Sequence, residues 1–254
     1  MITAAYIDFF LKIKTKIIQS QTLIFSDESS VSQKMQPNWF DSSYWKTENR
    51  IVGQAKGRFI TWFIKPLALL PEVSNEWVLR HYYRGGMIAK VSKDRFFYTG
   101  IKNTRCYLEV DLLIKMLGMS LPVPKPIGAR VIKKDLFYQA DLLMEKIDAT
   151  DLCGILKKRE LSNKEWKNIG EVIAKFHSNG VYHSDLNAHN VMQDSDGKIW
   201  LIDFDRCEIR KNELTWQQQN LARLKRSFLK EKALYSTFYF DEDSWCDLMK
   251  GYQT

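Results

Sequence analysis

The chain has 254 residues, of which 45% are hydrophobic, 13% aromatic and 27% charged, and its formal net charge at pH 7 is +8. This composition excludes an intrinsically disordered chain, and the length suits one large domain or two lobes around a cleft. The sequence lacks both a run of about 18 apolar residues, which a transmembrane helix needs, and the pattern of a signal peptide, so we expect a cytoplasmic protein.

The basic charge is compatible with three kinds of partner: nucleic acid, an anionic membrane surface or a phosphorylated substrate. Charge alone does not choose among them. The cysteines are scattered without metal-ligand spacing, so we expect reduced thiols at four positions: Cys106, Cys153, Cys207 and Cys246.

The N-terminal segment carries apolar residues at helical spacing with lysines between them over residues 2–18, which predicts an amphipathic basic helix. Such a helix either packs on its own domain, the more frequent case, or lies on an anionic membrane. Residues 26–36 are rich in Ser, Asp, Gln and Lys, which indicates a loop or linker. We treat residues 1–38 as an N-terminal extension.

A pair of glycines, Gly53 and Gly57, lies between the apolar runs 51–52 and 59–64. This pattern predicts a strand, a glycine turn and a second strand. In a nucleotide-binding enzyme such a turn lets backbone N–H groups approach phosphates, so both glycines are candidate nucleotide-binding residues. An ordinary hairpin loop is the alternative.

A cation and a glutamate follow on two further elements. Residues 76–81 predict a strand that carries Arg80, and residues 106–117 predict a helix that carries Glu109. In protein-kinase-like enzymes, a strand cation paired with a helix glutamate holds the α- and β-phosphates. Lys90 competes for this role through its Ile-Ala-Lys context, and we favour Arg80 by position. Without that pairing, Glu109 is a solvated carboxylate.

The middle of the chain indicates a boundary between two lobes. Three prolines within 121–126 end the helical region, and residues 137–144 predict an apolar strand followed by a hinge at 145–147. We therefore assign residues 1–148 to an N-terminal lobe and residues 149–254 to a mostly helical C-terminal lobe. In the latter, Ser162 and Glu165 form a capping box before a helix that Asn179-Gly180 ends.

The stretch that follows this helix contains the strongest chemical signal. Asp185 precedes Asn190 by five residues in the pattern H-x-D-x-x-x-x-N, which starts at His183. Asp-Gly at 196–197 then predicts a hairpin, and Asp203 ends the apolar run of its second strand. Phosphoryl transfer needs one carboxylate to take the proton of the acceptor hydroxyl, and an amide and a second carboxylate to hold Mg²⁺. Asp185, Asn190 and Asp203 fit these roles in order.

A plainer interpretation is that these Asp and Asn residues form turns. The joint context of capped helix, loop, hairpin and metal aspartate favours catalysis. After Asp205 the chain is basic, and helical periodicity covers 220–229. The cations of this segment either contact an anionic acceptor or membrane, or form a solvated helix face: Arg206, Arg210, Lys211, Arg223, Lys225, Arg226, Lys230 and Lys232.

These segments resemble the lipopolysaccharide kinase family, in particular its branch that phosphorylates 3-deoxy-D-manno-octulosonic acid (Kdo). The resemblance extends from about residue 39 to the C-terminus and is carried by five segments: 39–45 (Trp-Phe-Asp with Tyr-Trp), 79–86 (Leu-Arg-His-Tyr with Arg-Gly-Gly), 121–126 (Leu-Pro-Val-Pro-Lys-Pro), 182–190 (Tyr-His-Ser-Asp-Leu-Asn-Ala-His-Asn) and 202–206 (Ile-Asp-Phe-Asp-Arg).

The resemblance implies an α+β fold of the protein-kinase-like type, with an antiparallel sheet and one main helix in the first lobe. It implies transfer of phosphate from ATP, with Mg²⁺, to the 4-hydroxyl of Kdo in Kdo–lipid IVA during lipopolysaccharide core synthesis. It places Asp185 as the catalytic base and Asn190 and Asp203 as Mg²⁺ ligands. The expected location is the cytoplasmic side of the inner membrane, on its anionic surface, without nucleic acid or an obligate protein partner.

Several positions depart from the protein-kinase pattern. Ser184 replaces the arginine of H-R-D, Asn187 stands where a phosphate-contacting lysine is common, and Asp205 replaces the glycine of D-F-G. These departures favour a constitutive small kinase over a regulated protein kinase. The alternatives are a kinase of heptose, choline or an aminoglycoside, or a pseudokinase that serves as a basic membrane-binding or nucleic-acid-binding scaffold.

Overall fold

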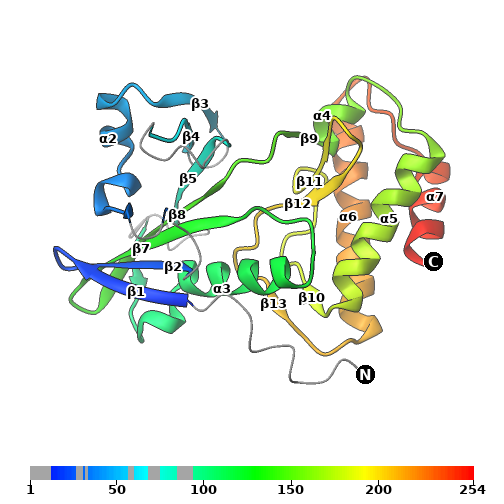
Figure 1. Ribbon diagram of the computed structural model, residues 1–254. Helices are drawn as coiled ribbons and strands as arrows, with labels where there is room; N and C mark the ends of the chain where they lie inside the picture. Colours follow the sequence, from blue (N-terminus) through cyan, green and yellow to red (C-terminus); the bar gives the residue numbers. More distant parts are fainter. Residues whose placement is uncertain (1–12, 27–30, 32–33, 57–59, 68–74, 85–93) are drawn as a thin grey trace. The chain divides into compact units, whose positions relative to one another are not determined.

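The computed structural model describes residues 13–26, 31, 34–56, 60–67, 75–84 and 94–254 (Figure 1). The chain forms two compact units. The first contains residues up to Lys115 together with Pro124–Lys146, and the second contains Met116–Val123 and Ile147–Thr254. Both helices and antiparallel strands are present, so the predicted α+β class is confirmed. None of the described helices combines the length and the apolar character that a membrane crossing requires.

The first unit is built on an antiparallel sheet with the strand order β1-β2-β7-β8-β5-β4-β3, and β6 pairs with the free part of β8. The strands are β1 (Ile13–Ile18), β2 (Gln21–Ser26), β3 (Ile51–Lys56), β4 (Ile60–Ile64), β5 (Trp77–His81), β6 (Phe96–Phe97), β7 (Pro126–Lys134) and β8 (Phe137–Glu145). The helices that the structure describes in full in this unit are η2 (Pro37–Phe40), α2 (Ser42–Thr47), η4 (Ile101–Asn103) and α3 (Arg105–Gly118), whose last three residues belong to the second unit.

The central strands of this sheet are buried on both faces, because successive residues of β8 enter different clusters. On β8, Leu143 packs with Trp39, Trp45 and Trp77, whereas Leu142 packs with residues of α3. Side chains alternate between the faces of a strand, so a continuous apolar run is what a sheet covered on both sides requires. The predicted strands at 76–81 and 137–144 and the predicted helix at 106–117 are confirmed.

The predicted helix over residues 2–18 is wrong where the structure describes it. Residues 13–18 form β1, which pairs with β2, and β2 pairs with β7. The β-branched side chains of Ile13, Thr15 and Ile17 favour a strand. Gln19 and Ser20 have φ values of 49° and 62°, as the tight turn between two antiparallel strands requires. Residues 2–12 lie outside the described residues.

The second unit contains four helices and five short strands. The helices are α4 (Leu152–Leu156), α5 (Asn163–Ser178), α6 (Leu214–Leu234) and α7 (Glu242–Tyr252), and the strands are β9 (Ala149–Asp151), β10 (Val181–Tyr182), β11 (Val191–Asp194), β12 (Ile199–Leu201) and β13 (Glu208–Ile209). β11 pairs with both β9 and β12, and β10 pairs with β13. The predicted capping box of α5 and the predicted hairpin of β11 and β12 are confirmed.

The helices of the second unit pack through a glycine contact and an aromatic cluster. α5 and α7 lie side by side (Figure 1), and a Cβ on Gly170 would lie 2.0 Å from the Leu248 carbonyl oxygen. Trp166 of α5 contacts Phe228 of α6 at a ring-centroid distance of 5.6 Å. The packing of apolar side chains thus holds α5 and α6 together, and these helices support the loop between β10 and β11.

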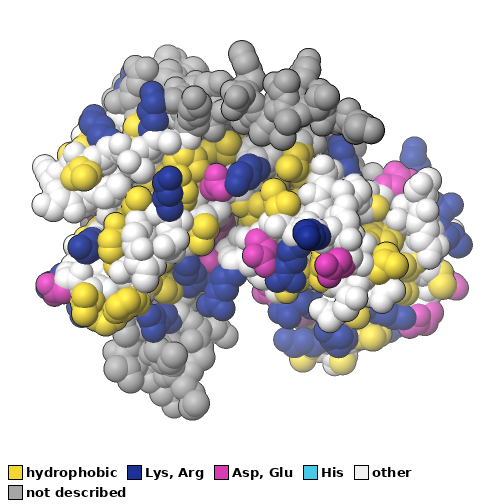
Figure 2. All heavy atoms as spheres, turned by 90° about the horizontal axis from the view of Figure 1, so that it is seen from below, with side chains coloured by type: hydrophobic (Ala, Val, Ile, Leu, Met, Phe, Trp, Pro, Cys, Tyr) yellow, Lys and Arg dark blue, Asp and Glu magenta, His cyan; other side chains and the backbone are white. Residues whose placement is uncertain are grey.

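Hydrophobic side chains also reach the surface. Figure 2 shows them in groups with Lys and Arg side chains next to them.

Candidate active site

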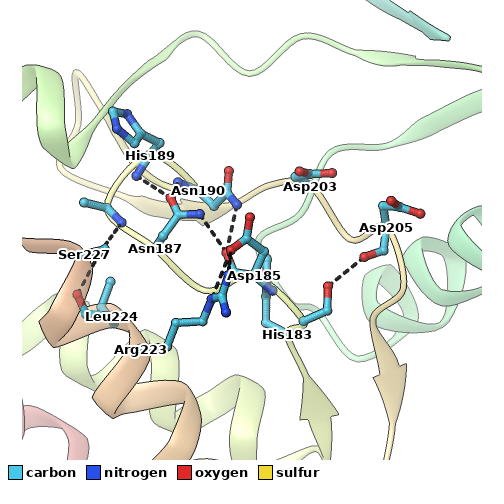
Figure 3. Close-up of polar contacts among 12 residues, drawn as sticks. His183, Asp185, Asn187, His189, Asn190, Asp203, Asp205, Arg223, Leu224 and Ser227 are labelled. Carbon is cyan, nitrogen blue, oxygen red and sulfur yellow. Dashed lines mark hydrogen bonds and ion pairs between the residues drawn. The ribbon is translucent and has the colours of Figure 1, made fainter. Parts of the chain in front are cut away.

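The loop between β10 and β11 carries Asp185 and Asn190, and the segment after β12 carries Asp203 (Figure 3). The hairpin pairing brings the two ends together, because the Ile202 amide donates a 3.0 Å hydrogen bond to the Asn190 carbonyl oxygen. Asn190 is 9% exposed, and its side-chain amide donates to the Asp185 carbonyl oxygen at 2.9 Å. The three residues predicted for catalysis and metal binding therefore belong to one small region of the second unit.

Asn187 holds this loop in shape. Its amide nitrogen donates to the Asp185 carbonyl oxygen at 2.9 Å, and its side-chain oxygen accepts from the backbone N–H groups of His189 and Asn190 at 2.9 and 3.2 Å. Asn side chains commonly form such bonds to the backbone two residues on. The side chain at the position where protein kinases place a lysine is thus occupied in supporting the backbone.

His183 is a buried support of Asp185. The Asp185 N–H donates to Nδ1 of His183 at 3.1 Å, so this nitrogen is unprotonated, and Nε2 donates to the Ile202 carbonyl oxygen at 3.0 Å. Burial lowers the pKa of His183 below its usual value, although the Ile202 carbonyl acts in the opposite direction. The neutral ring therefore joins the backbone of the loop to the strand that precedes Asp203.

Asp203 has a left-handed backbone, with φ of 63°, which is unusual for a residue other than glycine. The residue after it supports this conformation. Phe204 is 1% exposed, and its ring stacks on Phe176 of α5 at 6.0 Å and contacts the His183 ring at 5.0 Å. Burial of Phe204 between these rings offsets the backbone cost and sets the direction in which the chain enters and leaves Asp203.

Ser184 joins the loop to the segment that follows Asp203. Its hydroxyl donates to the Asp205 carbonyl oxygen at 2.8 Å, and its N–H donates to the Cys207 sulfur at 3.2 Å. In protein kinases an arginine at this position meets an activation-loop phosphate. Here a short neutral side chain makes a fixed contact instead, so the connection does not depend on phosphorylation.

An arginine on α6 lies against the predicted base. The Arg223 Nε donates to Oδ1 of Asp185 at 3.0 Å, and its terminal nitrogen NH2 contacts the same oxygen. Both side chains are about half exposed, at 48% and 47%. The same helix fixes the loop a turn further on, because the Ser227 hydroxyl accepts from the Ala188 N–H at 2.9 Å. The sequence placed Arg223 only within a basic segment, since nothing local connects it to Asp185.

His189 belongs to a second polar group beside the loop. Its ring nitrogens lie 3.5 Å from an Asp151 oxygen and 3.4 Å from a Glu231 oxygen. Cys153 is close by, and its thiol donates to Glu231 at 3.5 Å. Burial raises the pKa of Cys153 to about 11, and the Glu231 contact acts in the same direction. This thiol is therefore protonated at neutral pH and is a poor nucleophile.

In the first unit, the predicted cation and glutamate meet. Arg80 NH2 lies 2.6 and 2.5 Å from the two oxygens of Glu109, and the Tyr82 hydroxyl donates to Glu109 at 2.5 Å. Glu109 is 3% exposed, so it is not a solvated helix carboxylate. Burial raises the pKa of Tyr82 well above its usual value, and the nearby Glu109 charge adds to this. The arrangement holds one guanidinium in place at the edge of a buried carboxylate.

Three further residues were predicted to bind nucleotide: Gly53, Gly57 and Lys90. Gly53 lies within β3, which continues to Lys56, so the predicted turn does not begin at residue 53. A register shift separates Ile51 and Gly53, and a Cβ on Gly53 would meet the Phe63 ring at 3.1 Å. Gly57 and Lys90 lie outside the described residues.

The metal-binding expectation can be examined on the donor atoms of the loop. Because the Asn190 amide nitrogen donates to Asp185, its oxygen is directed away from that bond, and within the described residues this oxygen accepts no hydrogen bond. Asp203 supplies a carboxylate across the hairpin. Amide and carboxylate oxygens are the ligands that Mg²⁺ prefers, so this pair fits a hard divalent cation.

Comparison with known proteins identifies the family of this chain. The model of the lipopolysaccharide kinase (Kdo/WaaP) family matches residues 42–252. The chain belongs to this family. It is therefore a phosphotransferase that acts on a hydroxyl group.

Several relatives are similar over nearly their whole length. A 3-deoxy-D-manno-octulosonic acid kinase of Mannheimia succiniciproducens is 43% identical over 93% of this chain and 98% of the relative. Proteins with the same name from Vibrio parahaemolyticus and Haemophilus influenzae are 44% and 40% identical, over 84% and 92% of this chain and 86% and 96% of theirs. Family membership thus covers both units and includes all the predicted site residues.

Proposed function

We propose that the protein transfers the γ-phosphoryl group of ATP to the 4-hydroxyl of Kdo in Kdo–lipid IVA, as a step of lipopolysaccharide core synthesis. The observation that carries the proposal is the similarity of 40–44% to proteins named 3-deoxy-D-manno-octulosonic acid kinase over most of the chain. The loop geometry supports it, because the two carboxylates of Asp185 and Asp203 and the amide of Asn190, the groups that such a reaction needs, lie within one hairpin-bound region.

In this proposal Asp185 is the general base. It accepts a hydrogen bond from the 4-hydroxyl and takes its proton as the oxygen attacks the γ-phosphorus, while the bond from that phosphorus to the bridging oxygen breaks and ADP leaves. Arg223 contacts Oδ1 of Asp185, which leaves Oδ2 for the acceptor. His183 and Asn187 hold the Asp185 backbone from both sides, so the carboxylate is positioned before the substrate arrives.

Arg223 has a second role in this proposal. Phosphoryl transfer spreads negative charge over the transferred group, and protein-kinase-like enzymes place a cation there. Asn187 cannot supply that charge, because its side-chain amide is neutral. Arg223 brings a guanidinium to the same neighbourhood from α6.

Arg80 is assigned to the α- and β-phosphates of ATP, and Glu109 and Tyr82 orient it. Lys90, Gly53 and Gly57 remain candidate nucleotide-binding residues. Asn190 and Asp203 would hold Mg²⁺, which neutralises phosphate charge when bound. The two units correspond in this proposal to the lobes of a protein-kinase-like fold, and the enzyme works at the cytoplasmic surface of the inner membrane.

The acceptor is tested with a matched pair of lipids. ATP consumption is measured with Kdo–lipid IVA and with lipid IVA, which lacks the sugar. Turnover only with the Kdo-bearing lipid supports the proposal. Equal turnover of both lipids contradicts it. The proposal is also contradicted if neither lipid is turned over while heptose, choline or an aminoglycoside is phosphorylated at a high rate.

A further inference from the structure

One end of the sheet in the first unit presents three large apolar side chains to solvent. Phe97 of β6 is 57% exposed, Phe137 of β8 is 42% exposed, and Leu136 in the turn between β7 and β8 is 63% exposed. Phe97 and Phe137 are cross-strand partners, so they share a face, and their ring centroids are 6.1 Å apart. We call these three residues the apolar tip.

The fold does not need an apolar residue at the turn. Asp135 and Leu136 form a two-residue connection in which Asp135 has φ of 54°. Positions of this kind usually carry Gly, Asn or Asp. The turn is held firmly, because the Tyr98 N–H donates to the Leu136 carbonyl oxygen at 2.9 Å. The leucine side chain is therefore displayed on a fixed support.

Cations surround the apolar tip. Lys133 and Lys134 directly precede the turn, and Arg95 directly precedes β6. Lys134 is the cross-strand partner of Phe137, and Arg95, Lys134 and Phe137 line the same small surface hollow. The three cations are exposed, and Asp135 is the one carboxylate within the turn.

We propose that the apolar tip and its three cations dock the protein on an anionic phospholipid surface. Leu136 and the two phenylalanines enter the boundary between headgroups and acyl chains, and Arg95, Lys133 and Lys134 contact lipid phosphates. The inference rests on the proposed function in so far as a lipid-linked acceptor requires the enzyme at a membrane.

Two features favour a lipid surface over a second copy of this chain. The apolar tip consists of three side chains, whereas a stable protein interface involves about 20–30 residues on each side. The apolar residues are also bordered by three cations and one carboxylate, and this excess of positive charge would repel its copy across a symmetric contact. An anionic surface matches both features.

The test measures co-sedimentation of the full chain with vesicles of phosphatidylcholine alone and with vesicles that also contain phosphatidylglycerol, without acceptor or ATP. Wild type is expected to bind only the anionic vesicles. Leu136→Ser/Phe137→Ser should lose at least tenfold in binding, and Lys133→Ala and Lys134→Ala should each lose about fivefold. The matched control is Leu214→Ser/Leu234→Ser on α6, whose side chains are 73% and 65% exposed, and it should bind as wild type.

A second readout guards against a folding defect. A dye that fluoresces in apolar surroundings is attached at Leu136→Cys in a Cys246→Ser background, because Cys246 is the exposed cysteine and the others are buried. Its emission should rise on anionic vesicles, whereas dye at Leu214→Cys should not respond. Unchanged vesicle binding of the Leu136/Phe137 variant overturns the proposal. The proposal is also overturned if the wild type forms a dimer in the absence of vesicles and the substitutions at Leu136 and Phe137 abolish that dimer.

Failure of this inference is distinguishable from failure of the proposed function. The Leu136/Phe137 variant should phosphorylate a deacylated, water-soluble Kdo acceptor as fast as wild type, because both side chains are exposed and neither belongs to the residues assigned to catalysis, metal or nucleotide binding. Loss of vesicle binding with full activity on the soluble acceptor supports docking. Vesicle binding by wild type without any Kdo phosphorylation leaves docking supported and contradicts the proposed function alone.

Discussion

Arg223 and Asp185, which lie 38 residues apart, form an ion pair in which one guanidinium contacts a single carboxylate oxygen. A surface ion pair between half-exposed partners adds little stability, typically below about 1 kcal/mol. Its value in this protein is therefore not structural. The pair places a positive charge beside the predicted base, where the loop residue Asn187 provides none.

Replacing Arg223 should reduce turnover rather than stability. For Arg223→Gln we expect kcat to fall by about 10²–10³-fold, the usual loss for one group that stabilises transition-state charge. Slow ATP hydrolysis without acceptor should fall as well, while the melting temperature stays within about 2 °C. Arg226→Gln, an exposed residue of the same helix, is the control. A rise in the acceptor KM at constant kcat would instead make Arg223 an acceptor-binding residue.

Breaking the Arg80–Glu109 pair should weaken nucleotide binding and also destabilise the first unit. Glu109→Gln leaves the guanidinium without its buried counter-charge, and such a change costs about 3–5 kcal/mol in comparable sites. We expect the ATP KM to rise at least tenfold. Tyr82→Phe removes one hydrogen bond to the same carboxylate, so it should cost only about 1–3 kcal/mol. An unchanged ATP KM in Glu109→Gln would remove the pair from the phosphate site.

The buried histidine of α5 should make stability depend on pH. Burial lowers the pKa of His177 to about 4, while its Nδ1 and the Tyr252 hydroxyl are 2.8 Å apart. The unfolded chain then binds the proton more readily, so the stability is complete above about pH 6.5 and is lost as the pH falls toward 4. Between pH 6.5 and 5.5 the loss is about 1 kcal/mol. Urea unfolding at both values checks this, and His177→Gln should flatten the difference.

The contact of α5 with α7 should not tolerate a side chain at Gly170. An alanine there would place its Cβ 2.0 Å from a backbone oxygen, which cannot move without shifting the helix. We expect Gly170→Ala to cost about 1–3 kcal/mol, measured by thermal unfolding. Gly154→Ala is the matched control, because its Cβ would lie 3.1 Å from the Thr150 methyl group and 3.7 Å from the Asp151 carboxylate oxygens, and it would meet no backbone atom at 2.0 Å. Equal stability of both variants would contradict the packing.

Local patterns predicted the elements that bear the site. The capping box of Ser162 and Glu165 and the Asp-Gly turn each act within a few residues, so the helix and the hairpin could be read from sequence. The hairpin then dictates that Asn190 and Asp203 approach each other. Their chemical roles stay predictions.

The sequence did not predict the contact of Arg223 or the strand at 13–18. The first depends on residues that are far apart in the chain, and the second on a spacing of apolar residues that fits both a helix and a strand. Arg223 reaches Asp185 through the packing of α6, and no periodicity identifies one arginine among the eight cations of that segment. Ile13 and Ile17 are four residues apart, which suits a helix as well as a strand, and Gln19-Ser20 lacks the usual glycine of a tight turn. Residues 13–18 form a strand because they pair with β2, which in turn pairs with the distant strand β7.

The central claim is that Asp185 transfers a proton from the Kdo 4-hydroxyl during phosphorylation. The most direct measurement locates the phosphate by ³¹P–¹H correlation NMR on Kdo–lipid IVA incubated with Mg-ATP and either wild type or Asp185→Asn, with Asp196→Asn as an exposed control in the nearby hairpin turn. We predict phosphate on the 4-oxygen with wild type and the control, and none with Asp185→Asn. Phosphate at another hydroxyl, or full product with Asp185→Asn, would contradict the account.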